Sequence, residues 1–189
     1  MESFEHVVKV YLESSGYTVS CGVKFPVRMR TKAKTKDGTK HYQKHGYEVD
    51  IVAARHGQLL LGSVKSFFGS RGVNRQGFRG IADRSRRTHF QRYMMFNRLK
   101  LRNAILHRAS EIYGFPMNQI RLALFVGKFL AADKEDVEAY LSKRGIDVIG
   151  PDVIVEQLLT LIGNRTYVND PVITTLRLLH SRGKLIASL

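Results

Sequence analysis

Residues 46–66 constrain the fold of this chain more than any other segment. Two short stretches rich in β-branched and apolar residues, 47–53 and 59–65, flank the polar tetrapeptide Arg-His-Gly-Gln at 55–58. Alternating apolar residues around a short glycine-containing polar segment are typical of two strands joined by a tight turn. The sequence therefore predicts a pair of strands here.

Charged and polar side chains interrupt these two apolar strands at regular spacing. Side chains alternate between the faces of a strand, so Glu48 and Asp50 project together, and so do Ser63 and Lys65. Burying a carboxylate or an ammonium group among apolar neighbours is costly unless the two form a pair or bind a metal ion. Asp50 and Lys65 are therefore the first candidates for a functional site.

The composition limits the class of protein. A chain of 189 residues with 43% hydrophobic residues is long enough for one domain of mixed secondary structure with a real core. The single cysteine, Cys21, excludes an internal disulfide framework, and no Cys/His cluster has the spacing of zinc ligands. No signal segment or membrane-length apolar run is visible, so we expect a cytoplasmic protein with no membrane partner.

The positive charge is concentrated in one part of the chain. The formal net charge is +15, and residues 24–108 hold 21 Lys and Arg against only four acids. A one-sided excess of this kind is typical of a surface that binds a polyanion. A solvated basic face that only keeps the protein soluble is the alternative.

Two basic segments stand out within that half. Residues 30–45 hold a Lys-Asp-Gly-Thr turn signal, which predicts a hairpin or a mobile loop that reaches a phosphate backbone. Residues 69–88 contain four glycines and six arginines, which suit close approach to a ligand and bonding to phosphates or guanine edges.

The remaining periodicity predicts a mixed order of helices and strands. A helix at 3–14 with Ser3 as N-cap precedes a strand at 17–23 that can continue to Met29. Later segments are a long helix at 88–113, a strand at 120–127, a helix at 133–144, a strand at 146–150 and helices at 152–162 and 171–181. We assign residues 1–150 to one domain with basic insertions at 30–45 and 69–88. Residues 151–189 form a C-terminal helical extension that packs on the core or makes a subunit contact.

The order helix, three strands, helix, strand resembles the PD-(D/E)XK nuclease superfamily, which has a restriction-endonuclease-like fold. The family motif is an acid on one strand followed by (D/E)-x-K on the next, and the matching positions are Asp50, Ser63 and Lys65. Glu5 matches the carboxylate that many members add from the first helix. The resemblance covers residues 3–66 by motif and 3–127 by element order. It implies an α/β (α+β) fold with an αβββαβ core, in which helices flank a mixed central sheet.

The resemblance also implies a chemistry. Asp50 and Glu5, with Glu48 as a further carboxylate and the carbonyl of Val64, would bind Mg²⁺, for which Mn²⁺ can substitute. Two carboxylates suit a hard cation that keeps other positions for water and a phosphate oxygen. Lys65 would orient the attacking water or stabilise the transition state. No small-molecule cofactor is expected.

Ser63 departs from the family motif, because a neutral hydroxyl is a poorer Mg²⁺ ligand than a carboxylate. Three explanations stay open. Glu48 replaces the missing acid, or Asp50 and Glu5 hold the metal while Ser63 acts through a water, or the site is inactive and the domain only binds DNA.

The combined interpretation is a metal-dependent endonuclease that hydrolyses DNA phosphodiester bonds. The long basic segments favour a sequence-specific type II restriction endonuclease that works as a homodimer on double-stranded DNA. A Holliday junction resolvase or repair nuclease acting on branched DNA is one alternative, and an inactive DNA-binding subunit is another. The predicted DNA contacts are Lys32, Lys34, Lys36, Lys40, Lys44, Arg71, Arg75, Arg79, Arg84, Arg86, Arg87 and Arg92.

Overall fold

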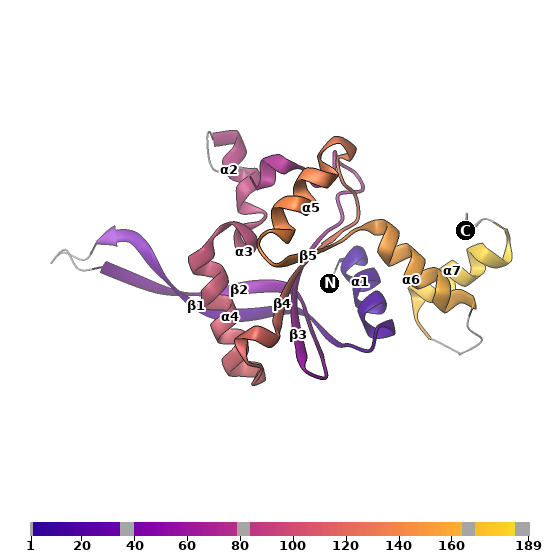
Figure 1. Cartoon of the computed structure of the whole chain (residues 1–189), viewed down its shortest axis with the longest axis horizontal. Helices are drawn as coiled ribbons and strands as arrows, with labels where there is room; N and C mark the ends of the chain where they lie inside the picture. The colour runs from indigo at the N-terminus through magenta and orange to yellow at the C-terminus, as the bar shows by residue number, and fades with distance from the viewer. Residues whose placement is uncertain (1, 35–39, 79–83, 164–168, 184–189) are drawn as a thin grey trace.

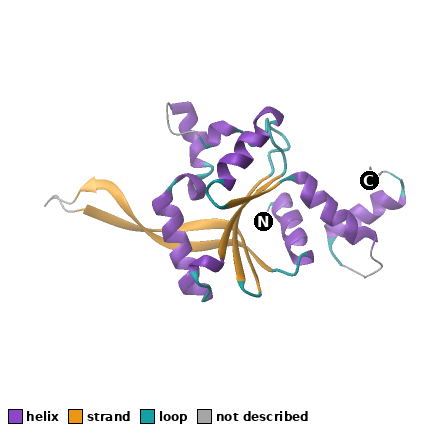
Figure 2. Cartoon of the chain, viewed as in Figure 1, coloured by secondary structure: helices purple, strands orange, loops and turns teal. Residues whose placement is uncertain are grey.

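The protein is an α/β structure in which helices flank a five-stranded mixed sheet of order β1-β2-β3-β4-β5 (Figures 1 and 2). The computed structural model describes residues 2–34, 40–78, 84–163 and 169–183, and in 29–34, 40–44 and 84–87 it describes the backbone alone. The strands are β1 (Thr18–Lys34), β2 (Lys40–Arg55), β3 (Gln58–Lys65), β4 (Ile120–Val126) and β5 (Ile146–Ile149). The helices are α1 (Ser3–Ser14), α2 (Arg84–Gln91), α3 (Met94–Asn97), α4 (Leu99–Tyr113), α5 (Lys134–Ser142), α6 (Pro151–Gly163) and α7 (Pro171–Ser181).

Strands β1 and β2 form a long antiparallel hairpin that projects away from the rest of the molecule (Figure 1). Their pairing runs from Thr18–Ala54 to Lys34–Lys40. The described parts of the basic segment, 30–34 and 40–45, therefore form a hairpin, which is one of the two structures predicted for it. Strand β1 extends beyond Met29, the predicted end. The hairpin brings the Lys-rich segment to one end of the molecule.

The sheet changes direction at β3. Strand β3 pairs antiparallel with β2 and parallel with β4, and β4 pairs parallel with β5. The β2–β3 ladder ends at Ile51–Gly62, whereas the β3–β4 ladder continues to Lys65–Val126. Residues of β2 before Ile51 therefore pair with β1 alone, and only residues 51–55 also pair with β3. The two strands diverge at the position of Asp50.

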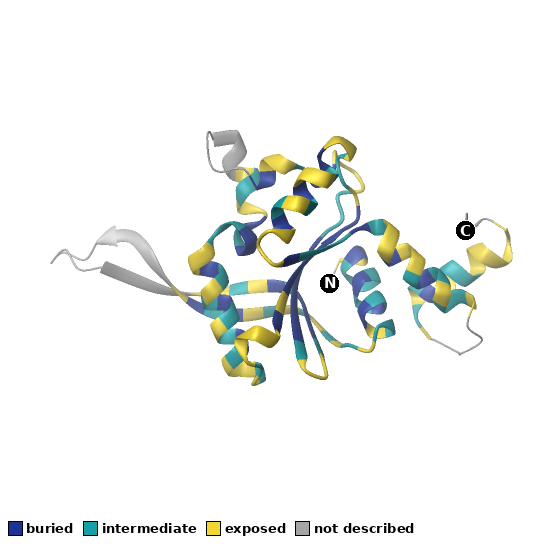
Figure 3. Cartoon of the chain, viewed as in Figure 1, coloured by how far each residue is buried: buried dark blue, intermediate teal, exposed yellow. Residues whose placement is uncertain are grey.

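Apolar side chains cover both faces of the sheet, and the buried residues follow the central strands (Figure 3). One cluster joins Phe25 and Leu61 of the sheet to Ile105 of α4 and Leu141 of α5. The other joins β-strand residues such as Phe125 to α1, α6 and α7. A sheet covered on both sides explains why β3 and β4 are nearly continuous apolar runs.

The predicted single helix at 88–113 is wrong, because the chain forms α2, α3 and α4 in its place. The breaks lie at Tyr93, with φ −122° and ψ 32°, and at Arg98, with φ −109° and ψ 98°. Tertiary contacts explain the first break: the buried Tyr93 ring lies 4.5 Å from that of Phe78, and Asn97 donates to the carbonyls of Gly77 (2.7 Å) and Phe90 (3.1 Å). Ile112, an apolar residue of this segment, is 48% exposed.

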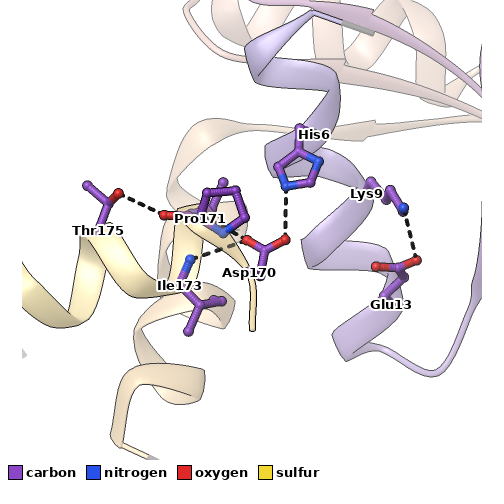
Figure 4. A network of polar contacts seen from close by, with 8 residues as sticks. His6, Lys9, Glu13, Asp170, Pro171, Ile173 and Thr175 are labelled. Carbon is purple, nitrogen blue, oxygen red and sulfur yellow. Dashed lines mark hydrogen bonds and ion pairs between the residues drawn. The ribbon is translucent and has the colours of Figure 1, made fainter. Parts of the chain in front are cut away.

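The C-terminal helices lie against α1. His6 Nε2 of α1 lies 2.9 Å from Asp170 Oδ2, and Asp170 Oδ1 accepts from the amides of Val172 and Ile173 as the N-cap of α7 (Figure 4). Ile154 and Ile173 are buried in the cluster that also contains α1. In the described parts of the chain, no helix has both the length and the apolar character needed to span a membrane.

Candidate functional site

The carboxylate of Asp50 lies at the fork between β2 and β3. Its Oδ2 accepts hydrogen bonds from the backbone amide of Val64 (2.7 Å) and the hydroxyl of Ser63 (2.9 Å). Because the backbone ladder between the strands has already ended at Ile51–Gly62, the Val64 amide has no β2 carbonyl opposite it in that ladder. The side chain of Asp50 satisfies this amide, so the fork itself fixes the carboxylate.

Gly62 holds the three strands close together beside this fork. A Cβ atom at this position would lie 2.7 Å from the Phe125 ring on β4 and 3.3 Å from Cβ of Ile51 on β2. Contacts below 3 Å force neighbouring groups apart. A side chain here would move the strand that carries Ser63, Val64 and Lys65.

The ammonium group of Lys65 lies between two oxygens. Its Nζ donates to the carbonyl of Val64 at 2.9 Å and lies 3.4 Å from Asp50 Oδ2. The side chains are 19% exposed for Lys65 and 23% for Asp50, so the charges are largely withdrawn from solvent and neutralise each other. One carboxylate oxygen and one carbonyl oxygen thus converge on a single cation.

A cleft of about 380 Å³ opens at this pair, and we call it the candidate active-site cleft. Its lining includes Glu5, Glu48, Asp50, Val64, Lys65 and Arg92. The sequence-predicted Glu5, Glu48, Asp50, Val64 and Lys65 therefore come together from α1, β2 and β3. Ser63 does not line the cleft and contacts Asp50 from β3 instead.

The carboxylates at the rim have other partners. Glu5 Oε2 accepts from the Glu2 amide at 3.0 Å, as part of a reciprocal capping box at the start of α1. Glu48 is 56% exposed and lies 3.9 Å from Lys24 Nζ. Within the described part of the chain, no three His, Cys, Asp or Glu side chains gather closely enough to hold one metal ion.

The donor set at the fork fits a hard divalent cation. The Asp50 carboxylate and the Val64 carbonyl already face one positive charge, and both are oxygen ligands of the kind Mg²⁺ prefers. Glu5 and Glu48 line the same cleft and would have to turn away from their present partners to join them.

Sequence reasoning missed Phe67, which also lines this cleft. Phe67 has φ +50°, a conformation that non-glycine residues rarely adopt. Such backbone strain clusters at functional sites. The guanidinium of Arg92 lies 5.7 Å from the centre of the Phe67 ring. Only the proximity of Phe67 to Lys65 in the sequence signalled a role for it.

The predicted DNA-contact residues differ in how the structure places them. Arg71 and Arg92 are exposed, whereas Arg75 forms ion pairs with Asp133 and Asp136. Lys36 and Arg79 lie outside the described residues. For the remaining positions the structure describes the backbone alone, which places Lys32 and Lys34 on β1, Lys40 and Lys44 on β2, and Arg84, Arg86 and Arg87 on α2.

Two tyrosines, the partly buried Tyr47 and the buried Tyr93, lie near charged groups of the site. Burial raises the pKa of Tyr47, and the negative charge of Asp50 raises it further, while a hydrogen bond with the Met95 backbone opposes both. Burial also raises the pKa of Tyr93, whereas the positive charge of Arg92 opposes that rise. The charges of Asp50 and Arg92 therefore act on these two pKa values in opposite directions.

Comparisons with known proteins leave the family open. No family model and no curated protein matches the chain. One similar solved structure is described as the crystal structure of a protein of unknown function, AF1548; it is 17% identical, with a TM-score of 0.39, over 96% of this chain and 77% of that one. A likeness at this level carries no argument about fold family or activity.

Proposed function

We propose that this protein is a Mg²⁺-dependent endonuclease that hydrolyses DNA phosphodiester bonds on a restriction-endonuclease-like core. The observation that carries the proposal is the convergence of the Asp50 carboxylate and the Val64 carbonyl on the Lys65 ammonium, at the point where β2 and β3 diverge. An acid and a lysine on adjacent strands, beside a cleft lined by the three further carboxylates of Glu2, Glu5 and Glu48, suit metal-assisted phosphoryl transfer.

Asp50 and the Val64 carbonyl, joined by Glu5 and Glu48, would hold the metal ion. When bound, Mg²⁺ supplies charge neutralisation at the phosphate and lowers the pKa of a coordinated water. Lys65 would leave its two oxygen partners and turn its ammonium toward the substrate, where it binds a phosphate oxygen or orients the attacking water. Ser63 would keep Asp50 in place through its hydrogen bond, which gives the hydroxyl a positioning role that needs no charge.

The charge distribution supports DNA as the substrate. Residues 24–108 carry 21 Lys and Arg against four acids and include the projecting hairpin and the segment after β3. The long basic segments favour a sequence-specific type II restriction endonuclease over a junction resolvase or repair nuclease. Cutting both strands requires two active sites and hence a homodimer. The exposed Val153, Val155 and Leu178 of α6 and α7 offer apolar surface for that contact.

A second candidate function is an inactive DNA-binding subunit of the same fold. Ser63 favours it, because this position carries a hydroxyl where the family motif has an acid, and that hydroxyl is already bonded to Asp50. Such a protein would keep its affinity for DNA without cutting it.

The test is cleavage of supercoiled plasmid and of four-way-junction DNA with Mg²⁺ by the natural protein, Asp50→Asn and Ser63→Glu. Asp50→Asn keeps the size of the side chain and removes the charge, so we expect cleavage to fall at least about a thousandfold. The matched control is Asp152→Asn, which removes an acid that is 81% exposed and paired with Lys134. We expect this control to cut at the natural rate.

The pattern of products separates the candidates. Discrete plasmid fragments support a restriction endonuclease, and cutting of the junction alone supports a resolvase. If the natural protein does not cut and Ser63→Glu does, the inactive subunit is the correct candidate. Cleavage that survives Asp50→Asn would refute the proposed site.

A further inference from the structure

A second cleft, of about 350 Å³, adjoins the candidate active-site cleft, and we call it the basic cleft. The two clefts share Phe67 and Arg92. Arg71 and His89 also line the basic cleft. Guanidinium and imidazole groups are hydrogen-bond donors of the kind that bind oxyanions.

Arg75 neutralises the acid in this cleft. The Asp133 carboxylate lines the basic cleft. It forms an ion pair with Arg75 Nε at 3.4 Å and accepts a hydrogen bond from the Arg75 amide at 3.1 Å. Arg75 also reaches Asp136 at 3.3 Å. By contrast, no carboxylate among the described residues lies within ion-pair distance of Arg71 or Arg92. Arg71 and Arg92 therefore present positive charge that no described acid neutralises and that can bind an anionic ligand.

Hydrogen bonds to residues 128–130 hold residues 70–73 in place, and we call this segment, which carries Arg71, the wall of the basic cleft. The Val73 amide donates to the Lys128 carbonyl, and the Leu130 amide donates to the Val73 carbonyl, both at 2.9 Å. Lys128 Nζ donates to the Ser70 carbonyl at 3.0 Å. Gly72 sits in this wall with φ +96°, where a Cβ atom would lie 2.6 Å from the backbone of Phe129. The wall is thus held in place before any ligand arrives.

We propose that the basic cleft binds a phosphate group, and that in the complex this is the DNA backbone phosphate next to the one held at Lys65. The assignment to DNA rests on the proposed function, whereas the affinity for phosphate follows from Arg71 and Arg92, which have no acid within ion-pair distance among the described residues. Because Arg92 and Phe67 belong to both clefts, one strand passes from Lys65 across Phe67 toward Arg71 and His89. This gives the bound strand a path on the protein.

The experiment measures binding of a fluorescein-labelled duplex and a four-way junction by anisotropy over a salt series, in EDTA so that nothing is cut. Arg71→Gln and Arg92→Gln are the test variants. Each is expected to weaken binding about tenfold and to reduce the slope of log affinity against log salt by about 0.9. His89→Phe, which keeps a ring but loses its donors, is expected to weaken binding about threefold.

Arg144→Gln, which removes the same positive charge elsewhere, serves as the control. Its guanidinium stacks on the Tyr140 ring at 3.5 Å. It is expected to change the affinity less than about twofold. Thermal melting checks that each variant is folded.

The results separate this proposal from the proposed function. If Arg71→Gln and Arg92→Gln behave like Arg144→Gln, the basic cleft is not a phosphate site, whatever the cleavage assay shows. If they lose affinity and salt slope while the natural protein never cuts DNA, the cleft stands and the nuclease proposal fails. Displacement of the duplex by millimolar inorganic phosphate, with unchanged salt slopes in the variants, would assign the cleft to free phosphate and overturn the assignment to DNA.

Discussion

The two clefts adjoin each other, but the charged side chains in them have different partners. In the candidate active-site cleft, the Lys65 ammonium is held between the Asp50 carboxylate and the Val64 carbonyl. In the basic cleft, Arg71 and Arg92 face the cavity with no described acid in ion-pair distance. The Asp50–Lys65 pair is neutral and internally satisfied, whereas the basic cleft carries net positive charge.

The side chains of the two clefts also differ in their exposure to solvent. Asp50 and Lys65 are about one-fifth exposed, so either charge without the other would be costly, and a metal ion bound there would have to displace Lys65. Arg71 and Arg92 are exposed, so water solvates their charges. The following predictions test this contrast, beginning with the largest expected effect.

Gly72→Ala is expected to destroy the basic cleft and leave the fork at Asp50 in place. The substitution adds a Cβ within 2.6–2.8 Å of the backbone of residues 128–130 and imposes a side chain at φ +96°. Strain and overpacking of this kind together cost about 3 kcal/mol or more. Chemical denaturation measures the loss of unfolding free energy, and anisotropy measures the loss of DNA binding.

Gly69→Ala is the matched control, because a Cβ atom there has no neighbour within 4 Å. It is expected to change stability by less than about 0.5 kcal/mol. Full DNA affinity in a folded Gly72→Ala protein would show that the wall of the basic cleft is not needed for binding.

The sequence predicted the β2–β3 strand pair and the grouping of its polar side chains, because the signals for both are local. A glycine turn between two apolar stretches predicts the β2–β3 pair, and strand alternation then groups Glu48 with Asp50 and Ser63 with Lys65. The Asp170-Pro171 start of α7 is equally local, because the aspartate caps the first amides of the helix. These predictions needed no knowledge of the tertiary structure.

The basic cleft was not predictable as a unit, because its parts meet only through long-range contacts. The sequence selected Arg71, Arg75 and Arg92 alike, and only the fold shows that Asp133 and Asp136 neutralise Arg75. The breaks in the 88–113 segment also have no local signal, since neither glycine nor proline lies there. Contacts of Tyr93 and Asn97 with the segment after β3 decide that geometry.

A double-mutant cycle on Asp50 and Lys65 tests whether this pair is a single unit. Asp50→Asn and Lys65→Met each leave one charge without its partner, whereas the double variant removes both charges. We expect the two losses of unfolding free energy to exceed the loss in the double variant by about 1 kcal/mol. The same cycle on Arg75 and Asp136, whose side chains are about half exposed, should give less than half of that.

Additive losses at Asp50 and Lys65 would contradict the pairing. The charge contrast between the two clefts would then reduce to a difference in exposure. Denaturation in urea at neutral pH with EDTA measures all seven proteins of the two cycles under one condition.

The smallest expected effect is a pair of opposite shifts in tyrosine titration. Because Asp50 raises the pKa of Tyr47, Asp50→Asn should lower it; because Arg92 opposes the rise at Tyr93, Arg92→Gln should raise that pKa further. Both phenols keep their protons in the folded protein above the ordinary pKa of 10.0, at which they ionise in the unfolded chain. The stability they contribute is therefore complete below about pH 10 and falls as the pH rises through the folded-state values.

Nuclear magnetic resonance of ring-labelled tyrosine follows each residue, with Tyr47→Phe and Tyr93→Phe to assign the signals. Shifts of the same sign at both tyrosines would refute the opposite effects assigned to Asp50 and Arg92.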